Sequence, residues 1–196
     1  LSQSYDDMGR ISSKTDALGN VTLYVYDDWG RLTAVQDELG FTTEYAYDDV
    51  GNLLTQTDSD DDVTAYAYNV RNLAVLKTDA EAREESYTYY ADGQIATQTD
   101  KNGVTASYTY DIHGRLFTVS KGDSTVSYSY DDNGNQLSVS DDTGTTSYTY
   151  DELDRAISKT VPDIGTATFE YDETEGVSYG YLKEITTDPK NNITEK

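Results

Sequence analysis

The chain has 196 residues, with 14 Lys and Arg against 37 Asp and Glu, which gives a formal net charge of −23 at pH 7. This negative field repels phosphate backbones, so we predict no nucleic-acid partner. The sequence contains no cysteine, which excludes disulfides and thiolate metal sites. No apolar run reaches the ~18 residues that a membrane-spanning helix needs, so we expect no membrane insertion.

From the first residues onward, the chain repeats one short stretch. YDDMGRISS at residue 5 returns as YDDWGRLTAV, YDDVGNLLT, YDIHGRLFT and YDDNGNQLS. The first tyrosine of each repeat, here called the anchor, recurs every 21 residues and twice after 20. A second aromatic residue lies two positions before every anchor except the first. The anchors are Tyr5, Tyr26, Tyr47, Tyr68, Tyr89, Tyr110, Tyr130, Tyr150 and Tyr171. A fixed period of this length is typical of repeat proteins.

Each repeat contains two turn signals. The first follows the anchor as D-x-x-G, where the glycine slot favours a left-handed backbone. Asn72 and Asp154 replace glycine in that slot, and these residue types tolerate the left-handed region best. The second signal lies near the middle of the repeat, as in TDALGN, TDSDDD and SDDTGT, where Asp begins the turn. The slot glycines are Gly9, Gly30, Gly51, Gly93, Gly114 and Gly134.

The segments between the turns have the length and alternation of strands. TTEYAYD and TASYTYD place both tyrosines on one face and Ala or Thr on the other, and RLTAVQD and GQIATQTD form return strands. The fold class is therefore all-β: an antiparallel meander of repeated hairpins, with on the order of seventeen strands. Open sheets rarely exceed ~10 strands without curling, so we expect a spiral sheet or partial β-shell.

We interpret residues 1–196 as a single array of about nine repeats and as a fragment of a larger protein. Residues 1–170 form regular repeats, and residues 171–196 form a modified repeat with a longer loop. Equivalent tyrosines form ladders across the strands that replace an oily core. Alanine at Tyr47 and Tyr68 is therefore expected to destabilise the protein far more than alanine at Asp60 and Asp61.

Candidate chemical sites are sparse. The single histidine, His113, occupies a turn position that Met8, Trp29 and Val50 fill elsewhere, which favours a turn-tip role over catalysis. Paired aspartates recur in the turns, where capping explains them, so we predict no enzyme activity and no cofactor. Calcium is the alternative for the clustered oxygens of residues 58–62 and 131–137, although neither has the full spacing of a calcium loop. The calcium candidates are Asp58, Asp60, Asp131, Asn133 and Asn135.

Arginine follows the turn glycine in several repeats, at Arg10, Arg31 and Arg115, and follows Asp154 at Arg155. One arginine per repeat among many carboxylates does not make an anion-binding patch. We expect these side chains to form ion pairs with neighbouring turns, each contributing little to stability.

The pattern Y-D-x-x-G-R-L, a D-x-x-G turn and Y-x-Y-D resembles the Rhs/YD-repeat family over essentially the whole chain. This family includes bacterial polymorphic toxins, wall-associated proteins, the shell component of insecticidal Tc toxins and, more distantly, animal teneurins. The resemblance implies a non-catalytic part of a β-shell that encapsulates or presents a C-terminal toxin or effector domain of the same polypeptide, in a secreted or cell-surface bacterial protein.

Two further expectations remain open. A cell-surface adhesion module that binds carbohydrate or protein is the alternative function, because sugars stack on aromatic faces. Unpaired strand edges at the two ends of the sheet also allow self-association.

Overall fold

The structure is a computed structural model that describes residues 2–171, 182–187 and 193–195. These residues form nineteen β-strands, so the predicted all-β class is confirmed and the strand number is slightly above the expected one. Within these ranges, no helix has the length and hydrophobicity needed to span a membrane. The chain divides into two compact units, Leu1–Val104 and Thr105–Lys196, here called the N-terminal and C-terminal units.

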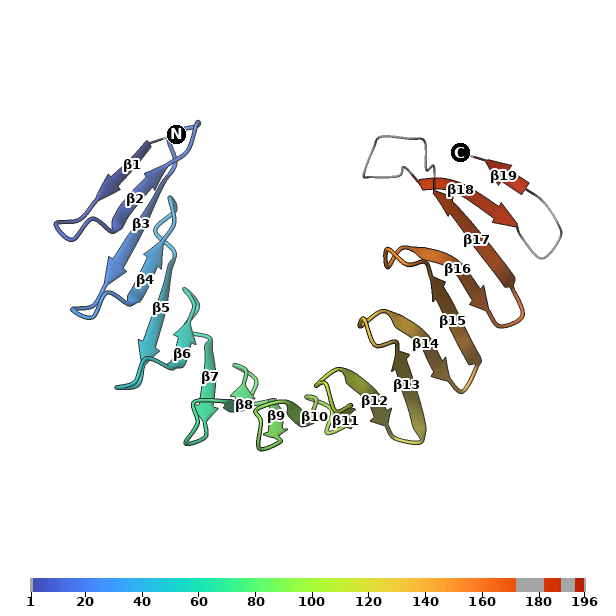
Figure 1. Cartoon of the computed structure of the whole chain (residues 1–196). Helices are drawn as coiled ribbons and strands as arrows, with labels where there is room; N and C mark the ends of the chain where they lie inside the picture. The colour runs from blue at the N-terminus through green and yellow to red at the C-terminus, as the bar shows by residue number, and fades with distance from the viewer. Residues whose placement is uncertain (1, 172–181, 188–192, 196) are drawn as a thin grey trace. The chain divides into compact units, whose positions relative to one another are not determined.

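The N-terminal unit is a ten-stranded antiparallel meander in which each strand pairs with the next (Figure 1). Its odd-numbered strands end at an anchor tyrosine and its even-numbered strands are the return strands. The strands are β1 Ser2–Tyr5, β2 Ile11–Thr15, β3 Val21–Tyr26, β4 Leu32–Gln36, β5 Thr42–Tyr47, β6 Leu53–Thr57, β7 Val63–Tyr68, β8 Ala74–Thr78, β9 Glu84–Tyr89 and β10 Ile95–Thr99.

The C-terminal unit continues the same hairpin pattern, again with each strand antiparallel to the next. Of the modified repeat expected at residues 171–196, residues 172–181, 188–192 and 196 lie outside the described residues. The strands are β11 Thr105–Tyr110, β12 Leu116–Lys121, β13 Ser124–Tyr130, β14 Gln136–Asp141, β15 Gly144–Tyr150, β16 Ala156–Val161, β17 Gly165–Tyr171, β18 Leu182–Thr187 and β19 Ile193–Glu195.

Each anchor tyrosine pairs with the first residue of its return strand, and for the anchors from Tyr5 to Tyr150 the register shifts by one residue at that point. In β3 and β4, Tyr26 pairs with Leu32 while Val25 pairs with Ala34, so Thr33 is an extra residue in β4. The same bulge recurs in the other hairpins that close on an anchor from Tyr5 to Tyr150. A β-bulge increases the local twist of the strand pair, so each of these eight hairpins carries one built-in twisting point.

The turn after each anchor from Tyr5 to Tyr150, here called the tyrosine turn, spans five residues. In residues 27–31 the amide of Asp27 donates to the carbonyl of Arg31 at 2.9 Å, and the amide of Gly30 donates to the carbonyl of Asp27 at 3.0 Å. The mid-repeat turn at residues 16–20 has the same two hydrogen bonds, from Asp16 to Asn20 and from Gly19 to Asp16. The same turn geometry therefore connects consecutive strands at both ends of the hairpins in the N-terminal unit.

The two 20-residue repeats arise from a different mid-repeat turn. Lys121 pairs with Ser124 and Asp141 pairs with Gly144, which leaves two-residue loops in place of the five residues between Thr15 and Val21. The flanking strands β12 to β15 each gain one residue over their N-terminal counterparts. The repeat therefore shortens by only one residue although the loop shortens by three.

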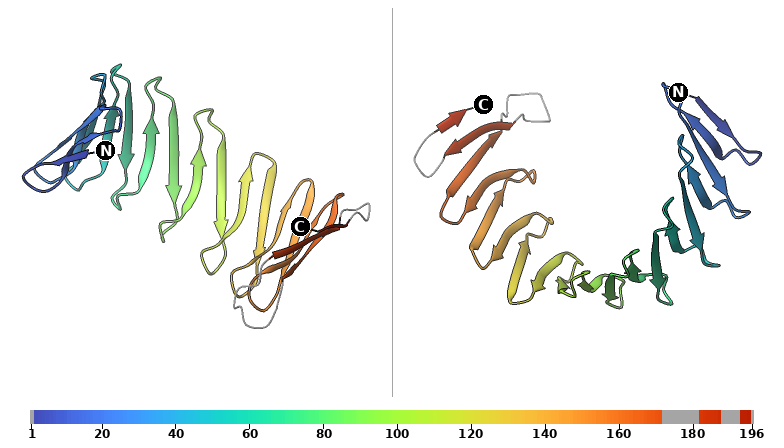
Figure 2. Two further views of the ribbon diagram at one scale, coloured as in Figure 1. Left: turned by 90° about the horizontal axis from the view of Figure 1, so that it is seen from above. Right: turned by 180° about the vertical axis from the view of Figure 1, so that it is seen from behind.

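Within each unit, the strands lie side by side in a single layer (Figure 2). Along β3, Thr22, Tyr24 and Tyr26 are half-buried on one face while Val21, Leu23 and Val25 are exposed on the other. We call the first the tyrosine face. Among the described residues no side chain is fully buried, either apolar or polar. The expected ladder of tyrosines on one face therefore exists, and its side chains shield one another without a second layer.

Candidate functional site

The aspartate that follows the anchor organises the tyrosine turn. Oδ1 of Asp27 accepts hydrogen bonds from the amides of Trp29 at 3.0 Å and Arg31 at 2.9 Å. The same pair of bonds reaches Asp6, Asp48, Asp111 and Asp151 from the third and fifth residues of their turns. Asp is suited to this position because its short side chain reaches backbone amides two residues on.

The hydroxyls of seven anchor tyrosines each connect one hairpin to the preceding one. The hydroxyl of Tyr26 donates to the carbonyl of Ile11 at 3.0 Å, and that of Tyr47 donates to Leu32 at 2.8 Å. In these seven bonds the acceptor is the carbonyl of the first residue of the preceding return strand. The other such pairs are Tyr68 with Leu53, Tyr89 with Ala74, Tyr130 with Leu116, Tyr150 with Gln136 and Tyr171 with Ala156. These bonds add a side-chain contact between two consecutive strands, across the point where one hairpin meets the next.

The arginines act within the same contact, and their expected ion pairs are corrected by the structure. Arg31 pairs with Asp27 of its own turn at 2.6 Å, because the five-residue turn brings its first and last residues together. Its Nη1 donates to the carbonyl of Asp48 in the next turn at 2.7 Å, and its guanidinium carbon lies 4.9 Å from the ring centroid of Tyr47. The neighbouring turn is thus bound through a backbone carbonyl and an aromatic ring. Arg10 and Arg115 repeat all three contacts.

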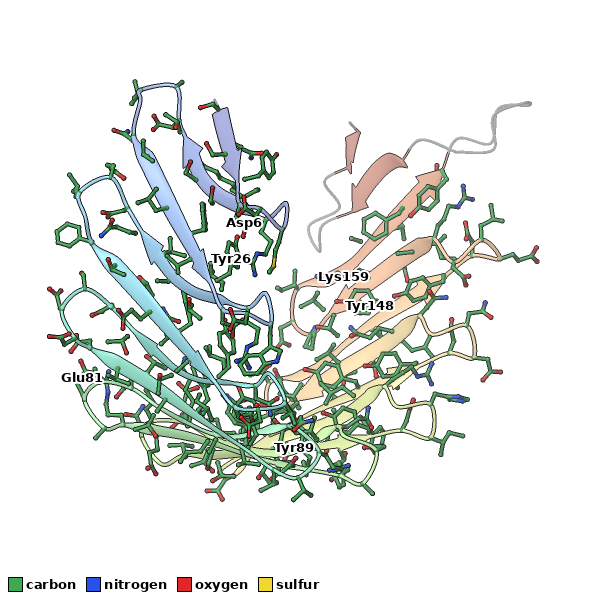
Figure 3. All side chains as sticks on the ribbon, turned by 90° about the vertical axis from the view of Figure 1, so that its left-hand side faces the viewer. Asp6, Tyr26, Glu81, Tyr89, Tyr148 and Lys159 are labelled. Carbon is green, nitrogen blue, oxygen red and sulfur yellow. The ribbon has the colours of Figure 1, made fainter. Side chains whose placement is uncertain are left out.

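We call this contact the hairpin joint: the fifth residue of one tyrosine turn, the anchor tyrosine of the next repeat and the turn that follows that anchor. Figure 3 labels Tyr26, the anchor of one such joint, and Asp6, which accepts a hydrogen bond from the joint residue Arg10. Arg155 lies over Tyr171 at 4.2 Å in the C-terminal unit. The cation–π contact adds to the hydrogen bonds because the ring presents its negative face to the guanidinium.

The joint has a second form in which asparagine replaces arginine. Nδ2 of Asn52 donates to Asp48 of its own turn at 2.7 Å and to Oδ1 of Asn72 in the next turn at 3.1 Å. Nδ2 of Asn135 donates to Asp131 at 3.0 Å and to Oδ1 of Asp154 at 2.6 Å. The short amide side chain therefore binds a side-chain oxygen where arginine binds a backbone carbonyl.

Charge and hydrogen bonding shift the pKa values of the joint residues. Burial by itself raises the pKa of Asp27, but hydrogen bonds from the Arg31 side chain and amide outweigh it, so the pKa falls below its ordinary value. The side chain of Asn52 is the main cause that lowers the pKa of Asp48. Burial, and then the proximity of Tyr45, raise the pKa of Tyr47. Both kinds of shift favour the protonation states present at neutral pH.

A separate ionic cluster joins two mid-repeat turns of the N-terminal unit. Lys101 and Arg83 both contact Asp79 at 2.8 Å, and Arg83 also contacts Glu81 at 2.8 Å. Glu81 is labelled at this turn in Figure 3. The Lys101 ammonium lowers the pKa of Asp79 strongly, with a further contribution from Arg83. The charged side chains of these two turns therefore have a structural role, which is to hold the turns together.

The remaining predicted positions are placed as follows. The six slot glycines have φ between 78° and 98°, and Asn72 and Asp154 each have φ 60°, so the left-handed slot is confirmed. Tyr5 is 59% exposed, and its hydroxyl donates to Oε1 of Gln3 in its own strand. Tyr110 ends β11 and pairs with Leu116. His113 is exposed at the third position of its turn, where its amide donates to Asp111 at 2.9 Å.

The calcium candidates lie in turns where their oxygens accept hydrogen bonds. Oδ1 of Asp58 accepts from the amides of Asp60 at 2.9 Å and Asp62 at 3.0 Å. Both carboxylate oxygens of Asp131 accept from Asn135, and Nδ2 of Asn133 donates to Asp154. In the part of the chain that the structure describes, no group of three or more His, Asp or Glu side chains is arranged to hold a metal ion.

The face opposite the tyrosines carries a feature that the sequence reasoning missed. In the C-terminal unit, hydroxyl side chains on adjacent strands pair at 2.6–2.9 Å across β11 to β17. The signal was present as Ser and Thr alternating with Tyr or Val, as in YTYD and FTVSK. The pairs are Thr109 with Thr118, Ser120 with Thr125, Ser129 with Ser138, Ser140 with Thr145, Thr149 with Ser158 and Thr160 with Thr166.

The chain is similar in fold to solved structures of Tc toxins. It matches the Photorhabdus luminescens Tc holotoxin pore, which carries a mutated TccC3, with a TM-score of 0.65 and 18% identity over 98% of this chain and 15% of that one. It matches the TcdB2-TccC3-Cdc42 complex with a TM-score of 0.60 and 18% identity over 98% and 16% of the two chains. It matches TcdB2-TccC3 with a TM-score of 0.60 and 20% identity over 98% and 12%. The chain thus spans less than a fifth of the length of these proteins.

Family comparisons agree with the repeat geometry. No curated protein matches the sequence. The family described as RHS Repeat matches residues 5–43 and 47–84, which contain the first hairpin joints. The family described as Teneurin YD-shell matches residues 82–184, which is more than half of the chain. The chain therefore belongs to the Teneurin YD-shell family and carries the RHS repeat in its N-terminal part.

Proposed function

We propose that this chain is one segment of a β-sheet shell that, in a longer polypeptide, encloses a C-terminal toxin or effector domain and catalyses no reaction itself. The single observation that carries the proposal is the single-layer sheet with no fully buried side chain among the described residues. A layer that is accessible on both faces suits a wall better than a compact core. The hairpin joint supports this role because it repeats the same contact from one hairpin to the next.

The proposed partner is the enclosed domain of the same polypeptide, in a bacterial protein that is secreted or held at the cell surface. The fold shared with the Tc holotoxin pore and with TcdB2-TccC3 supports this partner, and the chain covers only 12–16% of those proteins. One of these structures is a Tc holotoxin pore that contains TccC3. A segment of this kind contributes to the shell by pairing with the strands that adjoin it in the longer polypeptide.

The test uses the complete polypeptide that contains this segment. We expect limited proteolysis to leave a domain after the repeats intact in the wild type, and to degrade it when Tyr47→Ala and Tyr68→Ala are introduced together. The pair Asp60→Ala and Asp61→Gly is the control, because neither side chain takes part in a joint. Equal digestion of the domain in all three proteins, or a polypeptide with no domain after the repeats, rejects the proposal.

The alternative of a carbohydrate-binding adhesion module requires free aromatic faces. Lys14 lies over Tyr24 at 5.4 Å and Lys159 lies over Tyr148 at 5.8 Å, and arginines cover several anchors. Figure 3 labels Tyr148 and Lys159, which are paired across β15 and β16. In each of these pairs, a cation lies over one face of a ring on which a sugar could otherwise stack. A glycan-binding screen of the chain that gave specific hits lost in Tyr24→Ala would favour adhesion instead.

A further inference from the structure

Asparagine is followed by glycine twice in the sequence, at Asn102–Gly103 and at Asn133–Gly134. Both pairs occupy the third and fourth positions of a five-residue turn that begins with aspartate, at residues 100–104 and 131–135. Both asparagines are exposed, and the two glycines have a left-handed backbone with φ 78° and 98°. The two sites therefore share a local sequence and a turn geometry, so their chemistry can be compared directly.

An asparagine that precedes glycine is able to lose ammonia without an enzyme. The glycine amide nitrogen forms a bond to the side-chain carbonyl carbon of asparagine, the bond from that carbon to Nδ2 breaks, and the proton of the glycine amide ends on the departing ammonia. Water then opens the resulting succinimide ring to give either aspartate or isoaspartate. Glycine favours ring closure because it has no side chain that obstructs the approach. The asparagine side chain must turn towards its own backbone for this attack.

The side chain of Asn133 is bonded to the next repeat. Its Nδ2 donates to Oδ1 of Asp154, in the following tyrosine turn, at 2.9 Å. Nδ2 of Asn135 donates to the same oxygen at 2.6 Å, so the contact belongs to the asparagine form of the hairpin joint. Ring closure at Asn133 requires its hydrogen bond to break. The Asp154 carboxylate also opposes the negative charge that the glycine nitrogen gains during the attack.

The side chain of Asn102 makes no hydrogen bond among the described residues. Its backbone amide donates to Oδ1 of Asp100 at 3.0 Å, which fixes the turn without involving the side chain. In both turns the glycine amide donates to the carbonyl of the first turn residue, at 2.8 Å for Gly103 and 3.2 Å for Gly134, so the attacking nitrogen is held in the same way. The difference between the two sites therefore lies in the asparagine side chains.

We propose that Asn102 is a site of spontaneous deamidation and isoaspartate formation, and that Asn133 is protected from the same reaction by its hydrogen bond to Asp154. The substrate is the chain itself and the co-reactant is water. The modified turn lies between β10 and β11. The proposal does not depend on the shell function.

The two products of the reaction affect the turn differently. Aspartate occupies the third position of other turns, at Asp60 and Asp92, so the turn accepts it. Isoaspartate adds one carbon to the backbone between residues 102 and 103. The hydrogen bonds from Asp100 to Val104 at 2.9 Å and from Gly103 to Asp100 at 2.8 Å cross this point, and a longer backbone does not preserve the geometry of both. Isoaspartate at residue 102 therefore weakens the turn, whereas aspartate does not.

The test follows both sites by peptide mass spectrometry while the folded chain is incubated at mildly alkaline pH, with electron-transfer fragmentation to separate aspartate from isoaspartate. We expect Asn102 to be converted at least fivefold faster than Asn133, with isoaspartate among its products. In guanidinium chloride the two rates should converge, because unfolding breaks the bond to Asp154. Equal rates at the two sites in the folded chain overturn the proposal. So does the absence of conversion at Asn102 in the folded chain when it proceeds in guanidinium chloride.

Melting curves test the effect of isoaspartate on the turn. The chain in which Asn102 has been converted to isoaspartate should melt at a lower temperature than Asn102→Asp, which carries the same charge without the added backbone carbon. Equal melting temperatures would contradict the weakening of the turn.

Two variants at Asp154 test the protection of Asn133. Asp154→Gly removes the acceptor and suits the φ of 60° at this position, so the rate at Asn133 should rise at least fivefold while the rate at Asn102 stays the same. Asp154→Asn is the matched control, because it keeps a side-chain oxygen as Asn72 does for Asn52, and Asn133 should remain slow. Circular dichroism before incubation establishes that both variants are folded. Equal acceleration at Asn133 in both variants, or none in Asp154→Gly, overturns protection by the hydrogen bond.

Discussion

The hydroxyl of Tyr47 donates a 2.8 Å hydrogen bond to the backbone carbonyl of Leu32, fifteen residues earlier in the chain. Leu32 begins the return strand of the preceding hairpin, directly after the turn whose arginine covers the Tyr47 ring. One side chain thus contacts the preceding repeat through its hydroxyl and through its ring. The repetition of this arrangement accounts for a sheet that is ordered although no described side chain is fully buried.

Replacement of Tyr47 with Phe removes the hydroxyl and keeps the ring. We expect Tyr47→Phe to lower the free energy of unfolding by about 0.5–1.5 kcal/mol, because the Leu32 carbonyl loses its donor. The measurement is urea denaturation followed by tyrosine fluorescence. Tyr45→Phe is the matched control, because the Tyr45 hydroxyl makes no hydrogen bond among the described residues. A loss of equal size in both variants would show that the hydroxyl of the anchor has no special role.

The ladder itself is tested by removing two rings. Tyr47→Ala combined with Tyr68→Ala removes two anchor rings, their hydroxyl bonds and the surface that covers Arg31. We expect the melting temperature to fall far more than in the pair Asp60→Ala and Asp61→Gly. Glycine is used at Asp61 because its φ is 64°, where alanine would add backbone strain. Comparable melting curves for the two double variants would contradict the ladder.

Ala82 is an alanine in a left-handed position. Its φ is 60° at the fourth residue of the turn 79–83, where most other repeats have glycine. We expect Ala82→Gly to raise the free energy of unfolding by about 1 kcal/mol, because glycine adopts this conformation without steric cost. Ala80 in the same turn has no positive φ, so Ala80→Gly should be neutral or destabilising. Chemical denaturation of both variants checks the prediction, and stabilisation by both would contradict it.

Stability should fall when the turn aspartates are protonated. Hydrogen bonds lower the pKa of Asp48, and the Lys101 ammonium lowers that of Asp79 more strongly. A pKa that is lower in the folded state than in the unfolded state stabilises the fold above the unfolded value of 3.8, and this stability is lost as the pH falls through the folded pKa. We therefore expect the urea midpoint to be constant from pH 7 to about 5 and to drop below about pH 4. In Asp79→Asn the drop should be smaller, and an equal drop would exclude Asp79 as a contributor.

Calcium should not stabilise the chain through the turn aspartates. Asp58 and Asp131 already accept hydrogen bonds from their own turns, which explains their position without a metal ion. We expect the melting temperature to be the same in millimolar calcium and in chelator. A calcium-dependent increase that disappears in Asp58→Asn or Asp131→Asn would assign a metal site to that turn.

Much of the local structure could be predicted from the sequence. The period of the tyrosines predicts the hairpins, and Asp and Gly at fixed offsets predict the turns. The replacement of glycine by Asn72 and Asp154 predicts a left-handed slot, which the structure confirms. The turns and the left-handed slot depend on residues within five positions of one another, where steric limits on the backbone are decisive. The local sequence pattern was therefore sufficient to predict them.

The partners of Arg31 and Asn52 could not be predicted in this way. Arg31 was expected to pair with a neighbouring turn, yet its ion pair is with Asp27, and it reaches the next turn through the carbonyl of Asp48 and the ring of Tyr47. Every residue has a backbone carbonyl, so the sequence does not show which carbonyl accepts the hydrogen bond. The Asn52–Asn72 bond joins residues that are twenty positions apart and is created by strand register.

By itself, the sequence determined the repeat, the all-β meander, the two turns of each repeat and the face on which the tyrosines lie, because each follows from the two-residue alternation of a strand and from turn chemistry. Only the tertiary structure decided the one-residue bulge after the tyrosine turns that follow Tyr5 to Tyr150, such as Thr33 in β4, and the carbonyl that seven of the anchor hydroxyls reach, such as Leu32 for Tyr47. The physical reason is register. A shift of one residue between strands moves every side chain to the other face, so the contacts between repeats exist only once all strands are paired.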